Sequence, residues 1–157
     1  MRFMGLDLGD RRIGVALSDP EGWLATGLTV LHRTSLERDL ATLADLARRY
    51  EVQVMVLGLP RRLDGSLGPQ ARKTIAFGQE LQRRLGIQVV YWDESLSTVE
   101  AEQAMIEAGV SRAKRKKKVD LVAATLILQS YLNHLSERHR AGSPPPSADT
   151  AGAERTD

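Results

Sequence analysis

The chain has 157 residues, 27% of them charged, and a formal net charge of +2. This length suits a single domain that buries roughly two thirds of the surface that its unfolded chain exposes. The chain has no cysteine and only three histidines, which excludes a disulfide scaffold and cysteine-based zinc or thiol chemistry and leaves oxygen ligands for any metal.

Three strand-like segments, rich in β-branched and apolar residues, open the chain at residues 2–8, 13–18 and 25–31. The connections between them are short, which favours an antiparallel meander. Thr34 and Glu37 then form the pattern of a capping box, and leucines at helical spacing predict an amphipathic helix that runs to Tyr50.

Strands and helices alternate in the rest of the chain. This order predicts an α/β fold with a mixed five-stranded sheet, in which three antiparallel meander strands are followed by two strands that alternate with helices, flanked by helices. The predicted later elements are a strand at Val52–Leu57, a helix at Gln70–Leu85 closed by Gly86, a strand at Ile87–Trp92, a short helix from Ser97 to near Gly109, and a last helix over about 119–138.

We assign residues 1–140 to one domain and expect residues 141–157, which are rich in Pro, Ser and Ala, to be disordered. Asp7 interrupts the apolar stretch at the N-terminus, and the longest apolar run, Leu121–Leu128, is too short to cross a bilayer. We therefore expect a soluble cytoplasmic protein with no membrane partner.

Positive charge is concentrated in residues 1–140, which carry +4 because residues 141–157 carry −2. The densest group is the basic run at residues 112–118, and arginine pairs such as Arg11-Arg12 and Arg61-Arg62 occur elsewhere. Such a run is typical of a solvated loop or helix end, and it is also the electrostatic signature of a site for a polyanion.

The first strand carries a carboxylate, Asp7, which shares one face with Phe3 and Gly5 while the alternate residues pack on the other face. Holding an ionised carboxylate in an apolar sheet costs on the order of several kcal/mol. Asp7 therefore needs a cation or a dense set of hydrogen bonds as its partner.

Two further carboxylates are expected near Asp7. Glu94 follows the last strand, and ligands of open α/β sheets bind beyond the carboxyl ends of parallel strands. Asp120 shares the buried stripe of the last helix with Ala124 and Ile127, so it should face the sheet. Each has a simpler reading, Glu94 as a surface loop residue and Asp120 as an acid that complements the dipole of the first helical turn.

Three oxygen donors without His or Cys suit a hard cation such as Mg²⁺ or Mn²⁺. A pair of such ions about 4 Å apart activates a water and stabilises the leaving oxygen of a phosphodiester. Asp7, Glu94 and Asp120 are therefore candidate metal ligands and catalytic residues, and the basic run would attract the polymer.

The chain also resembles a known family, the YqgF or RuvX family of pre-16S rRNA nucleases, which is related to the RuvC Holliday junction resolvases. The resemblance covers about residues 3–135. It is carried in order by Gly5-Leu6-Asp7-Leu8-Gly9 with Arg12-Ile13-Gly14-Val15-Ala16 and Ser18-Asp19, by Gly58-Leu59-Pro60 with Asp64-Gly65-Ser66, by Asp93-Glu94 with Leu96-Ser97-Thr98, and by Lys117-Lys118-Val119-Asp120 with Ala123-Ala124.

This resemblance implies a ribonuclease H-like fold in which Asp7, Glu94 and Asp120, carried over by position, bind divalent metal. It implies a divalent-metal-dependent endonuclease whose usual role is processing of the 5′ end of pre-16S rRNA, with Holliday junction resolution as the role of the relative. The partner would accordingly be an rRNA precursor or branched DNA. The residues expected to hold its backbone are Arg12, Arg61, Arg62, Arg115, Lys116, Lys117 and Lys118.

The chain departs from the family pattern at three places. Ser95 stands where the family usually has Arg after its Asp-Glu pair, and Arg61-Arg62 stand where an Asn-containing stretch is usual. Asp10 occupies a position where a small or hydroxyl residue is more common, and we expect it to close a turn rather than bind metal. These changes affect substrate contacts more than the metal site.

Two other classes of function stay open. An actin-like or sugar-kinase ATPase also begins with Asp-Leu-Gly on a first strand, but it needs two such domains and this chain has room for one. A non-catalytic, ribosome-associated RNA-binding module would keep the basic run without cleaving. A resolvase would also need a twofold homodimer, for which Trp23 or the helix around Met105-Ile106 are candidate surfaces.

Overall fold

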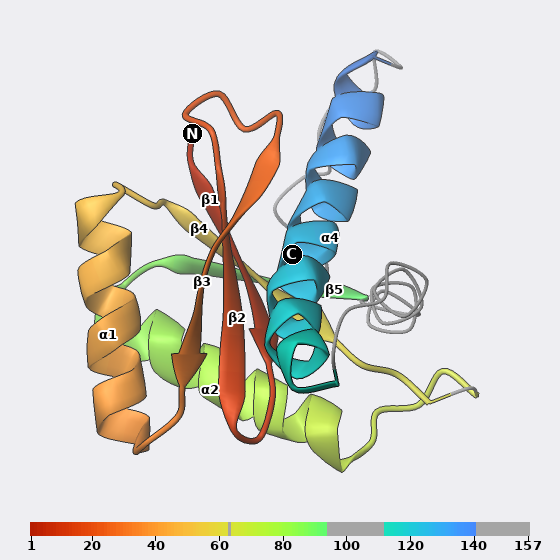
Figure 1. Cartoon of the computed structure of the whole chain (residues 1–157). Helices are drawn as coiled ribbons and strands as arrows, with labels where there is room; N and C mark the ends of the chain where they lie inside the picture. Colours follow the sequence, from red (N-terminus) through yellow and green to blue (C-terminus); the bar gives the residue numbers. More distant parts are fainter. Residues whose placement is uncertain (63, 94–111, 141–157) are drawn as a thin grey trace.

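The computed structural model describes residues 1–62, 64–93 and 112–140, with the backbone alone for residues 112–117 and 140. One five-stranded sheet, with strand order β3-β2-β1-β4-β5, forms its centre (Figure 1). β1, β2 and β3 pair antiparallel, and β4 and β5 run parallel to β1, which confirms the predicted mixed sheet. The strands are β1 (Phe3–Leu8), β2 (Arg12–Ser18), β3 (Ala25–His32), β4 (Val54–Leu59) and β5 (Gln88–Asp93).

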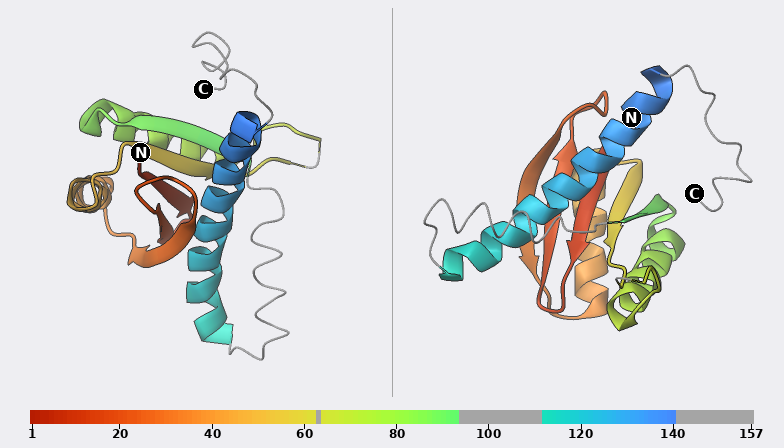
Figure 2. Two further views of the ribbon diagram at one scale, coloured as in Figure 1. Left: turned by 90° about the horizontal axis from the view of Figure 1, so that it is seen from above. Right: turned by 90° about the vertical axis from the view of Figure 1, so that its right-hand side faces the viewer.

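Helices cover both faces of this sheet. α1 (Leu36–Arg49) and α2 (Pro69–Leu85) lie on one face, and α4 (Arg112–Arg140) crosses the other (Figures 1 and 2). Each face has its own apolar core, one around Leu6 against α1 and α2 and one around Phe3 against α4. The alternation of β1 therefore matches the prediction, because Phe3 and Gly5 face α4 while Leu6 faces the other way.

The ends of α1 and α2 follow local signals in the sequence. Ser35, not Thr34, is the N-cap of α1, and its hydroxyl accepts a hydrogen bond from the Arg38 N–H. The predicted capping box of Thr34 and Glu37 is therefore wrong by one residue, and Glu37 instead pairs with Arg84 of α2. α2 ends at Gly86, whose φ of 65° lies in the left-handed region that glycine tolerates best.

α4 begins seven residues earlier than the sequence predicted, at Arg112 rather than near residue 119. The basic run is therefore the start of a helix and not a loop before it. Lys and Arg are good helix formers, so the charge of a segment does not exclude a helix. Asp120 consequently lies in the third turn of α4, which rules out a role as an acid of the first turn.

α4 packs very closely on the sheet at positions that lack a side chain. A Cβ built on Gly14 of β2 would stand 2.0 Å from the Asp120 carbonyl oxygen, and one built on Gly5 of β1 would stand 2.7 Å from the Leu128 Cβ. A real Cβ atom essentially never makes contacts shorter than 3.0 Å, so a side chain at either position would push the helix away. The two glycines thus set the height of α4 above the sheet.

Among the residues that the structure describes, no helix combines the length and apolar character required to cross a bilayer. The predicted helix from Ser97 to Gly109 and the tail at 141–157 lie outside the described residues.

The glycine contact can be tested by substitution. Gly14→Ala should lower the free energy of unfolding by about 1–3 kcal/mol or more, because the new methyl group would collide with backbone of α4. Gly27→Ala on β3 is the matched control, since its methyl group would meet only side-chain atoms, chiefly of Leu121, which can change rotamer. Urea denaturation of both variants measures the difference, and equal losses would contradict the proposed role of Gly14.

Candidate active site

Asp7 lies at the carboxyl end of the central strand, on the α4 face of the sheet, and is half-buried. Its partner across the antiparallel pair is Gly14. Continuing the β1–β4 register by one residue beyond Leu6 and Leu57 sets Gly58 on its other side. Asp7 is therefore flanked by two glycines, and on the Gly14 side the backbone of α4 occupies the place that a side chain would take.

Asp120 is brought to the same place by α4. Its backbone lies directly over Gly14, the register partner of Asp7, so the two acidic residues are neighbours on the α4 face of the sheet. The Asp120 carboxylate accepts a hydrogen bond from Arg12 Nε at 2.6 Å, and the side chains of the pair are 26% and 18% exposed for Arg12 and Asp120. Residues 108 positions apart in sequence thus form an ion pair beside Asp7.

The turn that links Asp7 to Arg12 is held from the opposite face of the sheet. Arg33 Nη1 donates to the Gly9 carbonyl at 2.9 Å, and Arg33 Nε donates to Asp39 of α1 at 3.2 Å. Gln70 of α2 donates to the Leu8 carbonyl at 3.1 Å. Both helices of that face therefore fix the end of β1 and the turn that follows it.

Asp10 lies in this turn and is exposed. Its carboxylate is 3.6 Å from Lys73 Nζ of α2, and the backbone closes the turn through a hydrogen bond from the Gly9 N–H to the Arg12 carbonyl. Asp10 thus faces Lys73, away from the Arg12–Asp120 pair.

The third predicted carboxylate, Glu94, lies outside the described residues. The residue before it, Asp93, ends β5 and is in register with Leu59 at the end of β4. β1, β4 and β5 are parallel, so their carboxyl ends meet at one edge of the sheet. Asp7 belongs to that same edge. Among the described residues, no group of three His, Asp or Glu side chains is arranged to hold a metal ion.

The predicted basic residues other than Arg12 belong to two elements, the loop after β4 and the start of α4. Arg61 and Arg62 are exposed and follow β4 directly. Their loop is closed by hydrogen bonds from the Arg62 N–H to Ser66 and from Arg61 Nη1 to Gly65, and the Ser66 hydroxyl lowers the pKa of Asp64 by donating to its carboxylate. Residues 115–118 belong to the first turns of α4, where Lys118 is exposed.

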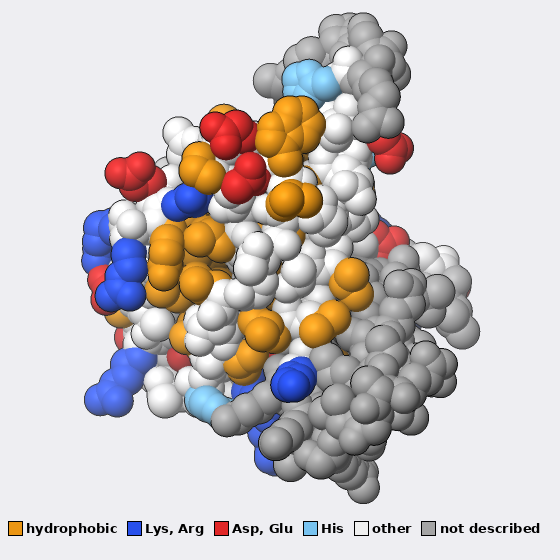
Figure 3. Space-filling view, turned by 45° about the horizontal axis from the view of Figure 1, so that its top comes forward, with side chains coloured by type: hydrophobic (Ala, Val, Ile, Leu, Met, Phe, Trp, Pro, Cys, Tyr) orange, Lys and Arg blue, Asp and Glu red, His pale blue; other side chains and the backbone are white. Residues whose placement is uncertain are grey.

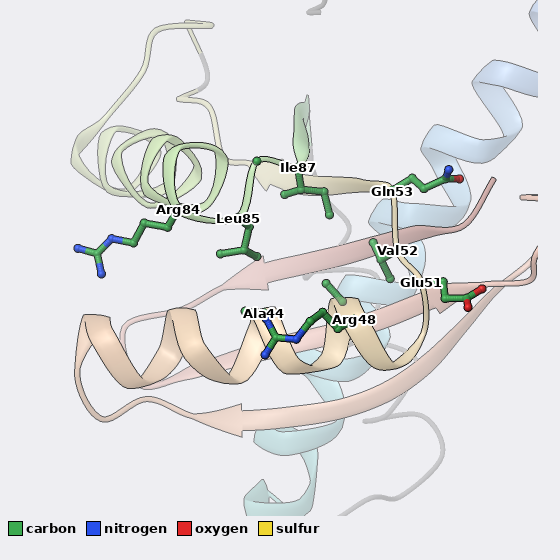
Figure 4. A pocket seen from close by; sticks show the side chains of 10 residues that line it. Ala44, Arg48, Glu51, Val52, Gln53, Arg84, Leu85 and Ile87 are labelled. Carbon is green, nitrogen blue, oxygen red and sulfur yellow. The ribbon is translucent and has the colours of Figure 1, made fainter.

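A groove of about 550 Å³ lies elsewhere, between the C-terminal ends of α1 and α2. The apolar side chains of Val52, Leu85 and Ile87 line it, as Figure 4 shows. Val52 and Ile87 precede β4 and β5, so the groove opens at the amino ends of the parallel strands, opposite to Asp7. It is therefore separate from the carboxylates.

Trp23, one of the candidate dimer surfaces, lies in the β2–β3 turn and is 57% exposed. Asp19 orders this turn by accepting hydrogen bonds from the backbone N–H groups of Leu24 and Trp23, which lower the pKa of its carboxyl. The other candidate, Met105-Ile106, lies outside the described residues.

Comparison with known proteins identifies the family. The family model described as "RuvX: Holliday junction resolvase" matches residues 1–134. The chain belongs to the RuvX family.

Curated proteins of two bacteria are similar to this chain over nearly their whole length. A protein of Moorella thermoacetica named "Putative pre-16S rRNA nuclease" is 53% identical over 137 residues, which make up 87% of this chain and 98% of that protein. A protein of Clostridium beijerinckii with the same name is 48% identical over 138 residues, or 88% of this chain and 100% of that protein.

Solved structures of resolvases share the fold. Thermus thermophilus RuvC in complex with a Holliday junction substrate superposes with a TM-score of 0.54 at 14% identity, over 87% of this chain and 96% of RuvC. A fowlpox virus resolvase in complex with Holliday junction DNA gives a TM-score of 0.53 at 16% identity, over 86% and 99%. These likenesses confirm the predicted α/β fold of the ribonuclease H-like type.

Sequence reasoning placed Asp7 and Asp120 on one face and missed the partner of Asp120. No local sequence pattern links Arg12 to Asp120, which lies 108 residues later in the chain. Gly14 and Gly58 were visible as members of the family motifs, but their position on both sides of Asp7 follows only from the strand register.

The hydrogen bonds that hold the turn after Asp7 should contribute to the stability of the folded protein. Asp39 is 6% exposed and accepts hydrogen bonds from Arg33 Nε and from the Thr34 N–H. Asp39→Ala should therefore lower the free energy of unfolding by about 1–3 kcal/mol, because two donors lose their acceptor. Asp45→Ala, which breaks the exposed pair with Arg48 on the same helix, should cost at most about 0.5 kcal/mol. Chemical denaturation compares the two, and similar losses would contradict the proposed support.

Proposed function

We propose that this protein is a divalent-metal-dependent endonuclease that processes the 5′ end of pre-16S rRNA during ribosome biogenesis, in the cytoplasm. The observation that carries the proposal is the position of Asp7 and Asp120 on one face, at the carboxyl end of the central strand, in a chain about half identical to proteins named as nucleases of this RNA. Backbone geometry thus supports the chemistry, and similarity supports the substrate.

Asp7 and Asp120, with Glu94 as the third carboxylate, would hold Mg²⁺ or Mn²⁺. These ions fit the donor set, because Asp7 and Asp120 offer only carboxylate oxygens as ligands. Among the described residues, no histidine forms a metal-binding group with them. Bound metal would supply an activated water and charge stabilisation for cleavage of a phosphodiester. Glu94 follows β5 directly, so a third ligand at the carboxyl edge is consistent with the parallel register of β1, β4 and β5.

The basic residues would hold the nucleic-acid backbone. Arg61 and Arg62 extend from the loop after β4, and Arg115, Lys116, Lys117 and Lys118 lie in the first turns of α4. The two groups come from elements on both sides of the carboxyl edge, so a backbone that passes over Asp7 could contact both. Such contacts carry affinity without sequence information.

Holliday junction resolution is the second candidate, and the description of the matching family model favours it. Symmetric cleavage of two strands requires a twofold dimer, and the exposed Trp23 turn is a candidate surface. A strictly monomeric protein in sedimentation experiments that cleaves a precursor-rRNA leader would exclude this candidate. A dimer that cleaves a four-way junction and leaves the RNA intact would replace the first proposal.

The catalytic assignment is tested with Asp7→Asn. Cleavage of a precursor-rRNA 5′ leader in Mg²⁺ or Mn²⁺ should fall by more than the roughly 10- to 100-fold that loss of an outer partner of a metal site costs, because a direct ligand is removed. Asp10→Asn is the matched control, since its carboxylate is exposed and faces Lys73. Asp10→Asn should cleave like the native protein.

Unchanged cleavage by Asp7→Asn would overturn the assignment. A native protein that binds the RNA but cleaves no tested substrate, whichever metal is present, would favour the non-catalytic RNA-binding module.

The binding assignment predicts a change in salt dependence. Each phosphate contact contributes about −0.9 to the slope of log K against log salt for a duplex and about −0.7 for a single strand. Replacing both Arg61 and Arg62 by Gln should therefore make the slope shallower by roughly 1.4–1.8, measured with the Asp7→Asn protein to prevent cleavage. Lys and Arg side chains gather along the left-hand edge of the face shown in Figure 3. The control is the pair Arg48 and Arg49, which lie in the last turn of α1. Replacing that pair removes the same charge and should leave the slope unchanged.

A further inference from the structure

We infer that Arg12 binds the phosphate at the reaction centre, with Asp120 holding its Nε so that the two terminal Nη groups face the substrate. This inference rests on the proposed nuclease function and deepens it, because it separates one arginine from the residues that hold the backbone at a distance.

The first argument is the way in which the guanidinium is held. Arg12 donates through Nε to Asp120, and neither Nη1 nor Nη2 donates to another of the described residues. The arginine side chain has five N–H donors in a fixed plane, so four of them remain for a ligand. The side chain is 26% exposed, which leaves these groups within reach of solvent.

Arg33 gives an internal comparison, since it lies on the same turn from the other face of the sheet. Its Nε donates to Asp39, its Nη1 donates to the Gly9 carbonyl, and its guanidinium lies 5.4 Å from the centre of the Phe77 ring. Several groups of the fold therefore occupy Arg33. Among the described residues, Arg12 has one such contact although it is equally close to the turn, which is the pattern of an arginine with a further ligand.

The position of Arg12 fits a phosphate at the carboxyl edge. Arg12 opens β2 two residues before Gly14, so the two residues lie on the same face of the strand, the α4 face with Asp7 and Asp120. It stands further toward the edge than Asp7, because β2 runs antiparallel to β1. A phosphate that enters beyond the end of β1 would meet the Nη groups before it reaches the carboxylates.

Asp120 prepares this contact by orienting the guanidinium. A phosphate accepts two parallel hydrogen bonds from one arginine, and the fork geometry requires the plane of the guanidinium to be fixed. A hydrogen bond at Nε restrains that plane, and it uses neither Nη group.

Kinetics give the first test. Arg12→Gln should lower kcat on the order of 100-fold with a smaller change in KM, as loss of a donor to developing charge does in other enzymes. Arg12→Lys, which keeps the charge and loses the fork, should recover only part of the rate. Arg11→Gln is the matched control, because Arg11 is the exposed neighbour in sequence, and it should retain the native kcat.

A second test does not depend on catalysis. Inorganic phosphate added to the metal-free protein should shift the ¹⁵N NMR signal of Arg12 Nε–H, and Arg12→Lys should bind this phosphate more weakly than the native protein and Arg11→Gln. The NMR titration uses the native chain, so it is informative even where Arg12→Gln folds poorly.

The outcomes distinguish a failure of the inference about Arg12 from a failure of the proposed nuclease function. Native cleavage with a lowered melting temperature in Arg12→Gln, and no response of Arg12 to phosphate, would make Arg12 a structural residue and overturn the inference. A phosphate response at Arg12 in a protein that cleaves no nucleic acid would keep the anion site and overturn the proposed nuclease function.

Discussion

Close packing of α4 on β1 and β2 is the contact on which the rest of the structure depends. Glycine at positions 5 and 14 lets the helix backbone come within the distance that a methyl group would occupy. The same contact sets Asp120 over the register partner of Asp7 and within hydrogen-bond distance of Arg12. The helix carries apolar residues such as Leu128 onto the core one or two turns further along. The same contact between α4 and the sheet therefore buries that core and brings the acidic residues together.

The helices on the other face of the sheet, α1 and α2, also stabilise the carboxyl end of β1. α1 and α2 bury their own apolar core, and each also sends one polar side chain to the end of β1 or the turn after it: Asp39 through Arg33, and Gln70 to the Leu8 carbonyl. Asp7 and Arg12 flank this turn. The result is a short connection held from the α1–α2 face, which restrains the backbone on which the carboxylate and the guanidinium are carried.

The sequence predicted those features that depend on neighbours along the chain. Alternation in β1 was sufficient to place Asp7 on the face of Phe3, and a left-handed glycine marked the end of α2 correctly at Gly86. The start of α4 was wrong because the basic run has no apolar periodicity, and its Lys and Arg residues favour a helix as readily as a loop. The Arg12–Asp120 pair could not be predicted from the sequence. A single arginine at the start of a strand is usually a surface residue, and the partner of Arg12 depends on how closely α4 packs on the sheet.

A site that binds both a cation and a phosphate has two opposed electrostatic requirements. Carboxylates attract the metal and repel the phosphate, and at about 5 Å with an effective dielectric constant near 20 each such pair is worth about 3 kcal/mol. Arg12 places a positive charge on the side from which a phosphate would enter, and through its Nε bond the same charge already offsets part of the negative charge of Asp120. A lysine could also bridge a carboxylate and a phosphate with its three N–H donors, but it lacks the planar fork with which a guanidinium offers a phosphate two parallel hydrogen bonds.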